Sequence, residues 1–464
     1  MKNLSVLTIF FILLSFPQFK EDTSNIPREG DEIQYWQIGY GIYNSGEYKR
    51  VPISYTYTEE EEVELGYRRG EPVYPFLIFL TLKIFNFDNL IDVSDCTSIK
   101  CDVLNEEVFA LSIFFYFLKF LCILIVYKTL KFRYSNLFSL LLSLAVILIL
   151  PYEFKDLITS IFLAFGLYYF ERNKYLSAVF FGFLPLSNAI FLYILPVVFL
   201  IFSLVRKKRL KETLIIFFIF VFPSLIWMTR NYINVDEFSI TGRGAEVLAI
   251  RAEYSTLTYE QIRHGFIYYT PGKPFILGAV QGRLWPKVTS AGSDVLYDRM
   301  NPNSAYKKGK SLTGNIGERF NKISNANDTY TEEQKKLQSV SINTIKENID
   351  KHLLLSFVFG YRGLFPPINY EFINYFELNN SVTFVLKEIF SVLRLIIIPY
   401  SLFLSFKSII NKNISFSLLL FLFTWGFYAS ITHFIPRYAT NLVIPAIFYL
   451  SNINRNTKTK DFFN

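Results

Sequence analysis

Long apolar runs, separated by short polar connections, are the feature that most constrains the fold of this chain. A helix needs roughly 20 apolar residues to cross the hydrocarbon layer of a bilayer. Among its 464 residues, 52% are hydrophobic and 18% are aromatic, which is too apolar for one aqueous globule of this length. We therefore predict a mostly α-helical, polytopic membrane protein with about ten transmembrane helices. The expected spans are residues 4–19, 107–126, 135–151, 157–170, 175–188, 189–205, 212–229, 386–406, 414–432 and 438–452.

The lysines and arginines of the short connections predict the orientation of these spans. Alternate connections are basic, as loops on the cytoplasmic side are, and they carry Lys2, 128–133, 172–174, 206–211, 407–412 and 455–460. The opposite short connections carry little more than Lys155 and Arg437. We expect an integral, multi-pass protein of a prokaryotic inner (plasma) membrane with both termini in the cytoplasm. Orientation accounts for the net charge of +8, so nucleic acid is not an expected partner.

This topology divides the chain into three parts. The predicted parts are an N-terminal transmembrane module at 1–229, whose first outer loop is 20–106, an outer (periplasmic) soluble domain at 230–385, and a C-terminal transmembrane module at 386–464. The first span is expected to be retained, because the residues that follow it contain no small-residue cleavage site.

Shorter elements are expected inside the two outer segments. Residues 72–86 are apolar but too short to span, which predicts an interfacial helix. Residues 331–350 place Leu337, Val340, Ile345 and Ile349 near one helical face, which predicts an amphipathic helix. Residues 301–327 are rich in Asn, Ser, Gly and Lys, which predicts a loop.

Cysteine and histidine are sparse. Cys96 and Cys101 share the first outer segment, where a disulfide and two free thiols are both open alternatives. Cys122 falls in a span and is expected to pack there. Three scattered histidines, His264, His352 and His433, do not form a predicted metal site.

Asp31 and Glu32 follow the first span and precede a stretch rich in Tyr and Trp. Carboxylates at a membrane surface are expensive to desolvate and have raised pKa values, which suits a general base or a metal ligand. The structural alternative is that Asp31 only caps a helix.

Arg68 and Arg69 directly precede the predicted interfacial helix, in the stretch Arg-Arg-Gly-Glu-Pro-Val-Tyr-Pro. Guanidinium groups bind phosphate oxygens bidentately, so the pair could hold a lipid phosphate. Anchoring to anionic headgroups is the alternative.

The order of these motifs resembles the GT-C superfamily of integral-membrane glycosyltransferases, near the protein O-mannosyltransferases and the lipid A aminoarabinose transferase. The resemblance rests on the Gly-Asp-Glu stretch with its aromatic helix, followed by the Arg-Arg-x-x-Pro-x-Tyr-Pro stretch. It extends to residues 151–156, 223–232 and 436–438. It covers about the first 250 residues and the last 30, and it departs from the family pattern at 185–188, where many relatives carry an Arg-Pro pair.

The resemblance implies an inverting enzyme that moves a sugar from a polyprenyl-phosphate donor to a hydroxyl of a lipid, glycan or protein acceptor at the outer face. Asp31 would be the catalytic carboxylate with Glu32 beside it, and Arg68 and Arg69 would lie near the donor phosphate. Asp156 would be the second acidic residue, with Glu153 near it as a further metal-ligand candidate. Arg437 would also face the phosphate. No cofactor is certain, and a divalent metal is left open.

Arg394 lies about two turns inside an expected span, where a buried charge is expensive. A lipid-phosphate contact and snorkelling to the outer surface are both considered for it. Two other functions compete with the glycosyltransferase. One is an O-antigen ligase or polymerase, and the other is a lipid or sugar transporter, although the acidic clusters lie outside the spans and no internal repeat is seen.

Overall fold

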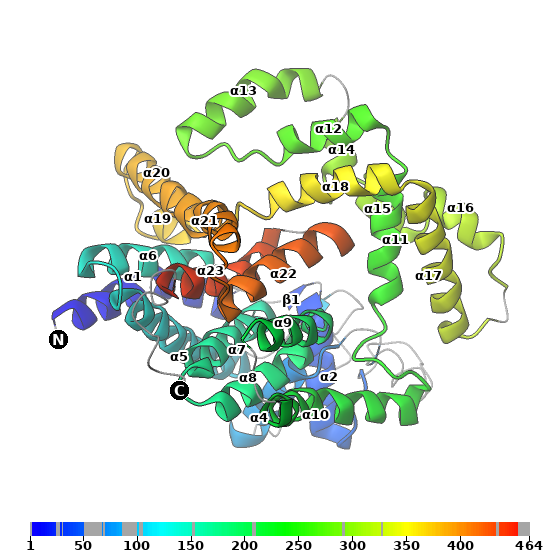
Figure 1. Ribbon diagram of the computed structural model, residues 1–464, viewed down its shortest axis with the longest axis horizontal. Coiled ribbons are helices and arrows are strands. Elements are labelled where there is room, and N and C mark those ends of the chain that lie inside the picture. The colour runs from blue at the N-terminus through cyan, green and yellow to red at the C-terminus, as the bar shows by residue number, and fades with distance from the viewer. Residues whose placement is uncertain are drawn as a thin grey trace.

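The computed structural model describes residues 2–24, 28–29, 31–50, 67, 70–85, 100–101, 105–150, 154–206, 210–289, 293–325, 328–432 and 436–452. These residues are overwhelmingly helical, as predicted (Figure 1). Their one strand pairing joins β1 (Arg28–Glu29) to β2 (Lys100–Cys101), antiparallel, and so connects the two ends of the segment predicted to be the first outer loop.

The N-terminal part contains two kinds of helix. The apolar runs give α1 (Lys2–Ser24), α5 (Asn105–Lys131), α6 (Asn136–Ile149), α7 (Phe154–Phe170), α8 (Lys174–Ser187), α9 (Phe191–Val205) and α10 (Leu210–Val235). The first outer loop adds α2 (Asp31–Ser45) and α4 (Val73–Phe85), and α4 confirms the helix expected at 72–86.

The basic connections end in side-chain caps. The side-chain oxygens of Ser135, Asn173 and Ser415 accept hydrogen bonds from the backbone N–H three residues later. Each cap satisfies an N–H group that the first helical turn leaves without a partner. Short connections can therefore reverse the chain between antiparallel helices.

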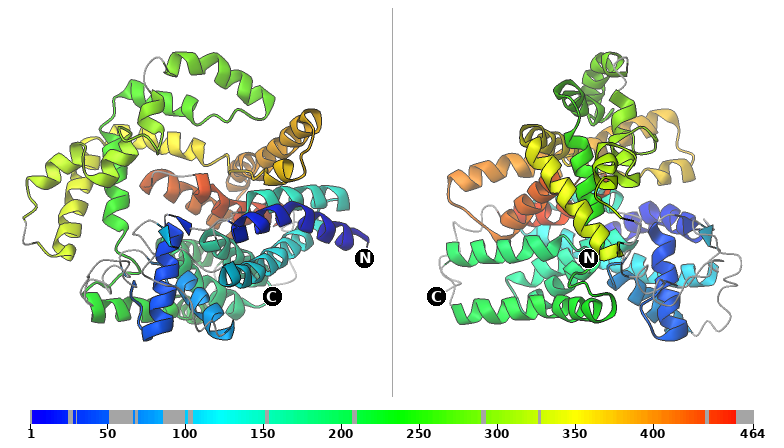
Figure 2. Two further views of the ribbon diagram at one scale, coloured as in Figure 1. Left: turned by 180° about the vertical axis from the view of Figure 1, so that it is seen from behind. Right: turned by 90° about the vertical axis from the view of Figure 1, so that its right-hand side faces the viewer.

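The segment predicted to be the second outer segment is a set of helices of 5 to 18 residues. They are α11 (Gly244–Ser255), α12 (Tyr259–Tyr268), α13 (Phe275–Thr289), α14 (Ser293–Tyr297), α15 (Ala305–Ser311), α16 (Asn315–Asn321), α17 (Tyr330–Glu347), α18 (Ile349–Arg362) and α19 (Glu371–Tyr375). Figure 2 shows α11 and α15–α18 gathered to one side of the apolar bundle.

The prediction of a loop at 301–327 is wrong, because this stretch contains α15 and α16. The Glu253 carboxylate accepts hydrogen bonds from the backbone N–H groups of Asn315 and Ile316, at 3.2 Å and 3.0 Å. A partner some sixty residues away in the sequence thus stabilises the first turn of α16.

The amphipathic helix predicted at 331–350 is confirmed in its central part. Leu337 and Val340 are buried on α17, against Ala249 and Ala252 of α11. Ile349 instead begins the next helix and is exposed.

The C-terminal part returns to apolar helices: α20 (Asn380–Ile397), α21 (Pro399–Ile410), α22 (Phe416–Ile431), the 3-10 turn η2 (Pro436–Ala439) and α23 (Thr440–Asn452). The span expected at 386–406 is divided, since α20 ends at Ile397 and Pro399 opens α21.

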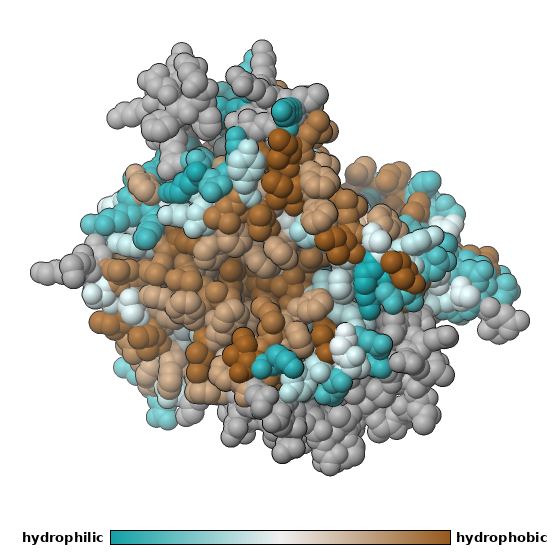
Figure 3. Space-filling model, turned by 90° about the horizontal axis from the view of Figure 1, so that it is seen from below, coloured by the Kyte–Doolittle hydropathy of each residue, from teal (hydrophilic) through white to brown (hydrophobic). Residues whose placement is uncertain are grey.

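By length and composition, three helical stretches of the described chain are suited to crossing a membrane: Phe109–Lys131, Thr213–Val235 and Asn380–Ile410. Eight further apolar helices are shorter. Only 17% of the apolar window in Thr213–Val235 is buried, and Phe218, Phe222 and Ile226 are exposed on it. Figure 3 shows hydrophobic residues spread over a broad face of the molecule, which is typical of a surface in contact with lipid.

Aromatic rings hold the apolar bundle together. Phe416 of α22 stacks on Phe170 of α7 with ring centroids 4.1 Å apart, and it also contacts Phe199 of α9 and Phe181 of α8. Gly166 allows α7 and α8 to pack closely, because a Cβ at this position would lie 2.7 Å from the Phe181 ring. Helices far apart in the sequence therefore share one core.

Candidate functional site

The first outer loop is built on the pair α2 and α4. Gly39 of α2 lies against Ile78 of α4 so closely that a Cβ would come within 2.6 Å of the isoleucine. Asp31 and Glu32 are the first two residues of α2, where the helix dipole favours negative charge. Their side chains lie outside the described residues.

Tyr35 connects the start of α2 to the stretch that carries the arginine pair. It follows Asp31 by four residues, which places the two on the same side of the helix. Its hydroxyl donates a hydrogen bond of 2.7 Å to Oε2 of Glu71, and both residues are buried. Glu71 was not among the predicted site residues, although it lies two residues after Arg69 in the quoted motif.

Arg68 and Arg69 lie outside the described residues, but the residues on both sides of them are fixed. The Tyr67 hydroxyl lies 2.6 Å from Ser239 Oγ, and burial raises the pKa of Tyr67 to about 12. On the other side, the Tyr48 hydroxyl donates to the Gly70 carbonyl at 3.2 Å. A Cβ at Gly70 would lie 2.2 Å from that hydroxyl, so a larger residue there would have to displace the Tyr48 side chain.

The C-terminal end of α10 contacts the same loop. The Arg230 guanidinium donates to the Tyr48 carbonyl at 3.1 Å and lies 5.2 Å from the ring centroids of both Tyr48 and Trp227. Trp227 Nε1 donates to the Ile240 carbonyl at 3.2 Å. The 223–232 motif therefore packs directly on the first outer loop.

Asp156 belongs to a second polar cluster, formed by the ends of four apolar helices. The Tyr428 hydroxyl of α22 accepts hydrogen bonds from the side-chain amides of Asn188 at 3.0 Å and Asn441 at 2.8 Å. Asp156 is buried and close enough to Tyr428 to interact with it electrostatically. Tyr438 stacks on Tyr428 with ring centroids 4.7 Å apart.

The second cluster includes residues from three stretches named in the comparison with the GT-C pattern, namely 151–156, 185–188 and 436–438. Arg437 lies in η2, next to the stacked Tyr438. Its side chain, like Glu153 as a whole, lies outside the described residues. Sequence patterns had not identified Tyr428 or Asn441, because both fall within or beside apolar runs.

The two clusters are neighbours. Leu186, which directly precedes Ser187 and Asn188, packs in one buried group with Ile38 and Ile42 of α2 and with Trp227 of α10. The first outer loop, the exit of α10 and the Asp156 cluster therefore form one continuous region at the helix ends.

Arg394 lies elsewhere. It is buried on α20, and its guanidinium donates to the backbone carbonyls of Lys273 at 2.8 Å and Pro366 at 3.3 Å. These bonds connect α20 to the segment before α13 and to the segment after α18. A lipid-phosphate contact for Arg394 stays a prediction.

Lys119 is a charged residue that the sequence analysis missed. It lies on α5 within the stretch Phe109–Lys131, and it is buried there, 5.9 Å from the centroid of the Tyr116 ring. A lysine inside an apolar run was the available signal, since such residues are usually functional or have a partner.

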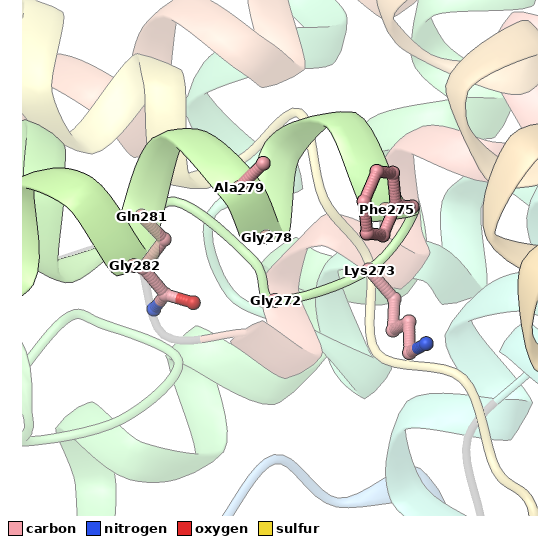
Figure 4. A pocket seen from close by; sticks show the side chains of 7 residues that line it. All are labelled: Gly272, Lys273, Phe275, Gly278, Ala279, Gln281 and Gly282. Carbon is pink, nitrogen blue, oxygen red and sulfur yellow. The ribbon is translucent and has the colours of Figure 1, made fainter.

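The described part of the chain also contains a cavity of about 440 Å³ between α13 and the loop before it (Figure 4). Its walls are Gly272, Lys273, Phe275, Gly278, Ala279, Gln281 and Gly282. No predicted site residue lines it, although Arg394 bonds the Lys273 carbonyl behind it.

Within the described residues, no three His, Cys, Asp or Glu side chains are grouped to hold a metal ion. The side chains of Asp31, Glu32 and Glu153 lie outside the described residues, and a divalent metal at these carboxylates stays a prediction. Comparison with known proteins found no match to a family model, to a curated protein or to a solved structure.

Proposed function

We propose that this chain is a multi-spanning membrane glycosyltransferase that uses a polyprenyl-phosphate sugar at the outer face of its membrane. The observation that carries the proposal is the convergence of the separated motifs on one region of the fold. Tyr35 joins the α2 start to Glu71 beside the arginine pair, and Leu186 packs this loop next to the Asp156 cluster.

In the proposed reaction, Asp31 accepts the proton of an acceptor hydroxyl as its oxygen attacks the anomeric carbon. A new glycosidic C–O bond forms on the opposite side from the breaking bond to phosphate, so the configuration inverts. The departing polyprenyl phosphate carries away the bonding electrons. Arg68, Arg69 and Arg437 stabilise its charge, as guanidinium groups do for phosphate oxygens.

The proposal includes a topology. Ten spans place both termini in the cytoplasm, residues 230–385 form an outer domain, and the two polar clusters lie on the outer side. The ends of α7, α8, α10 and α22 that meet at the clusters are those that the charge pattern assigns to the outer face. The helices shorter than a full bilayer would cross with flanking polar residues at the interfaces.

The test is transfer from a panel of polyprenyl-phosphate sugars to membrane extracts, with the intact protein in proteoliposomes. Asp31→Asn should abolish transfer, because the amide cannot accept the proton. Glu347→Gln is the matched control, since it removes the same charge from an exposed ion pair with Arg319 and should leave transfer unchanged. Full activity of Asp31→Asn would remove the assigned base and favour the O-antigen ligase. Transport of donor without transfer would favour the transporter.

A further inference from the structure

Helix α13 exposes apolar side chains that no other described element covers. Phe275 and Ile276 are 69% and 75% exposed, and Val280 and Leu284 are also exposed. Ile276, Val280 and Leu284 recur every four residues, so they lie along one side of the helix. All views in Figures 1 and 2 show α13 at the edge of the molecule, beyond α12.

The first turn of α13 is fixed against α20. The Lys273 ammonium pairs with Glu388 Oε1 at 2.8 Å, and the Phe275 N–H donates to Glu388 Oε2 at 2.8 Å. The Arg394 guanidinium bonds the Lys273 carbonyl at 2.8 Å. The Lys273 ammonium also lies 4.0 Å from the centroid of the Phe384 ring.

These bonds bring two exposed apolar surfaces together. On α20, Phe384, Val385 and Ile389 are exposed, and α20 begins the stretch Asn380–Ile410, which is long and apolar enough to cross a membrane. The exposed side of α13 therefore starts beside a surface suited to lipid. Water would be an unfavourable neighbour for so much adjoining apolar area.

The charges of α13 indicate which surface would cover it. The helix carries Arg283 and Lys287 and no acidic residue. Arg283 is exposed and lies between Val280 and Leu284 in the sequence, on the same side of the helix as Ile276. A long arginine side chain can extend from the apolar side of a helix to the phosphates of an anionic bilayer while the apolar residues beside it contact acyl chains.

We propose that α13 lies in the membrane interface beside α20, with its apolar side in the acyl region and Arg283 at the lipid phosphates. The helix then attaches the second outer segment to the bilayer at a point separate from the spans. Its occupant is the lipid surface itself, and this placement does not depend on glycosyl transfer.

The test uses a fluorophore on single cysteines in the full chain. Cys96 and Cys101 are replaced by serine, and Cys122 is fully buried and stays unlabelled. The labelled variants are Ile276→Cys on α13, Phe218→Cys as the lipid-facing control, and Ser339→Cys on the exposed side of α17 as the aqueous control. The proteins are placed in phosphatidylethanolamine and phosphatidylglycerol vesicles, with a fraction of lipids carrying a nitroxide on the acyl chain.

The expected result is strong quenching at 276 and 218 and little at 339. Adding Arg283→Glu should reduce quenching at 276, and more so as the phosphatidylglycerol fraction rises. Quenching at 218 with none at 276 would overturn the proposal, and so would absence of quenching at both. The remaining alternative is that a second copy of the chain covers α13. Nanodiscs that contain one chain each distinguish it from contact with lipid. Quenching at 276 should persist there, whereas shielding of 276 that requires a second chain would assign the surface to a contact between copies.

Discussion

At the scale of single residues, buried hydrogen bonds fix the two parts of the first outer loop to each other. The Tyr35 hydroxyl and the Glu71 carboxylate join the start of α2 to the stretch that carries Arg68 and Arg69. A hydrogen bond to a charged group in a buried setting contributes more than a neutral one. The geometry of the predicted catalytic end of α2 therefore depends on a residue pair that is 36 positions apart in the sequence.

Removing this hydrogen bond should destabilise the protein. Tyr35→Phe takes a donor away from the buried Glu71 carboxylate, which should lower the free energy of unfolding by about 1.5–3 kcal/mol. Thermal unfolding in detergent measures the change. The double variant Tyr35→Phe with Glu71→Gln should lose less than the sum of the two single variants. Strict additivity would show that the two groups do not interact.

His352 should make stability depend on pH. Burial and the nearby Arg251 cation lower the pKa of His352 to about 4, and its Nδ1 accepts from Arg251 Nε at 3.3 Å. Between pH 6.5, the ordinary value, and pH 4, the unfolded chain binds a proton that the folded chain does not. The free energy of unfolding therefore falls as the pH falls through this window, and this contribution is unchanged above pH 6.5.

His352→Asn keeps an acceptor near Arg251 and removes the titration. Melting temperatures of the two proteins at pH 7 and pH 5 give the comparison. The wild type should lose more stability between these values than the variant. Equal losses would mean that His352 does not titrate in this range and that other groups set the pH dependence.

At the scale of helices, the apolar runs predicted where most elements lie, because long runs define helices with little help from tertiary contacts. The helix α16 was missed because its first turn depends on capping by the distant Glu253. The helix α15 was missed although Ser304 caps it locally. The break between α20 and α21 had a local signal in Pro399. Asp156 could be selected as an acidic residue opening a helix. Its neighbour Tyr428 could not, because only tertiary packing brings α7 and α22 together.

Close packing between α7 and α8 should make Gly166 sensitive to substitution. Gly166→Ala places a Cβ 2.7 Å from the Phe181 ring, and such overpacking typically destabilises by about 1–3 kcal/mol. Gly426→Ala on α22 is the matched control, since its Cβ would meet nothing within 4 Å. That change should leave thermal stability unchanged or raise it, because alanine favours helix. A lower melting temperature for Gly426→Ala than for Gly166→Ala would contradict the α7–α8 packing.

At the scale of the whole molecule, the directions of the four helices around the Asp156 cluster are consistent with alternate crossing. The Asp156 cluster gathers the start of α7, the Asn188 cap after α8, α22 through Tyr428, and the start of α23. Helices that run toward the cluster thus alternate with helices that run away from it. The basic residues Arg172, Lys174 and Lys412 lie at or beside the opposite ends of α7, α8 and α22. The basic ends of these three helices therefore lie away from the Asp156 cluster, as the proposed topology requires.

This two-sidedness predicts which positions are accessible from outside the cell. With Cys96 and Cys101 replaced by serine, Ser339→Cys on α17 should react with a membrane-impermeant maleimide in intact cells, because its segment faces outward in the proposed topology. Lys412→Cys, in the exposed turn after α21, should react only after the membrane is permeabilised. Both positions are exposed in the folded chain, so a difference in labelling reports the side of the membrane and not burial. Labelling of both in intact cells, or of Lys412→Cys alone, would reverse or abolish the proposed orientation, and with it the placement of Asp31 on the outer face.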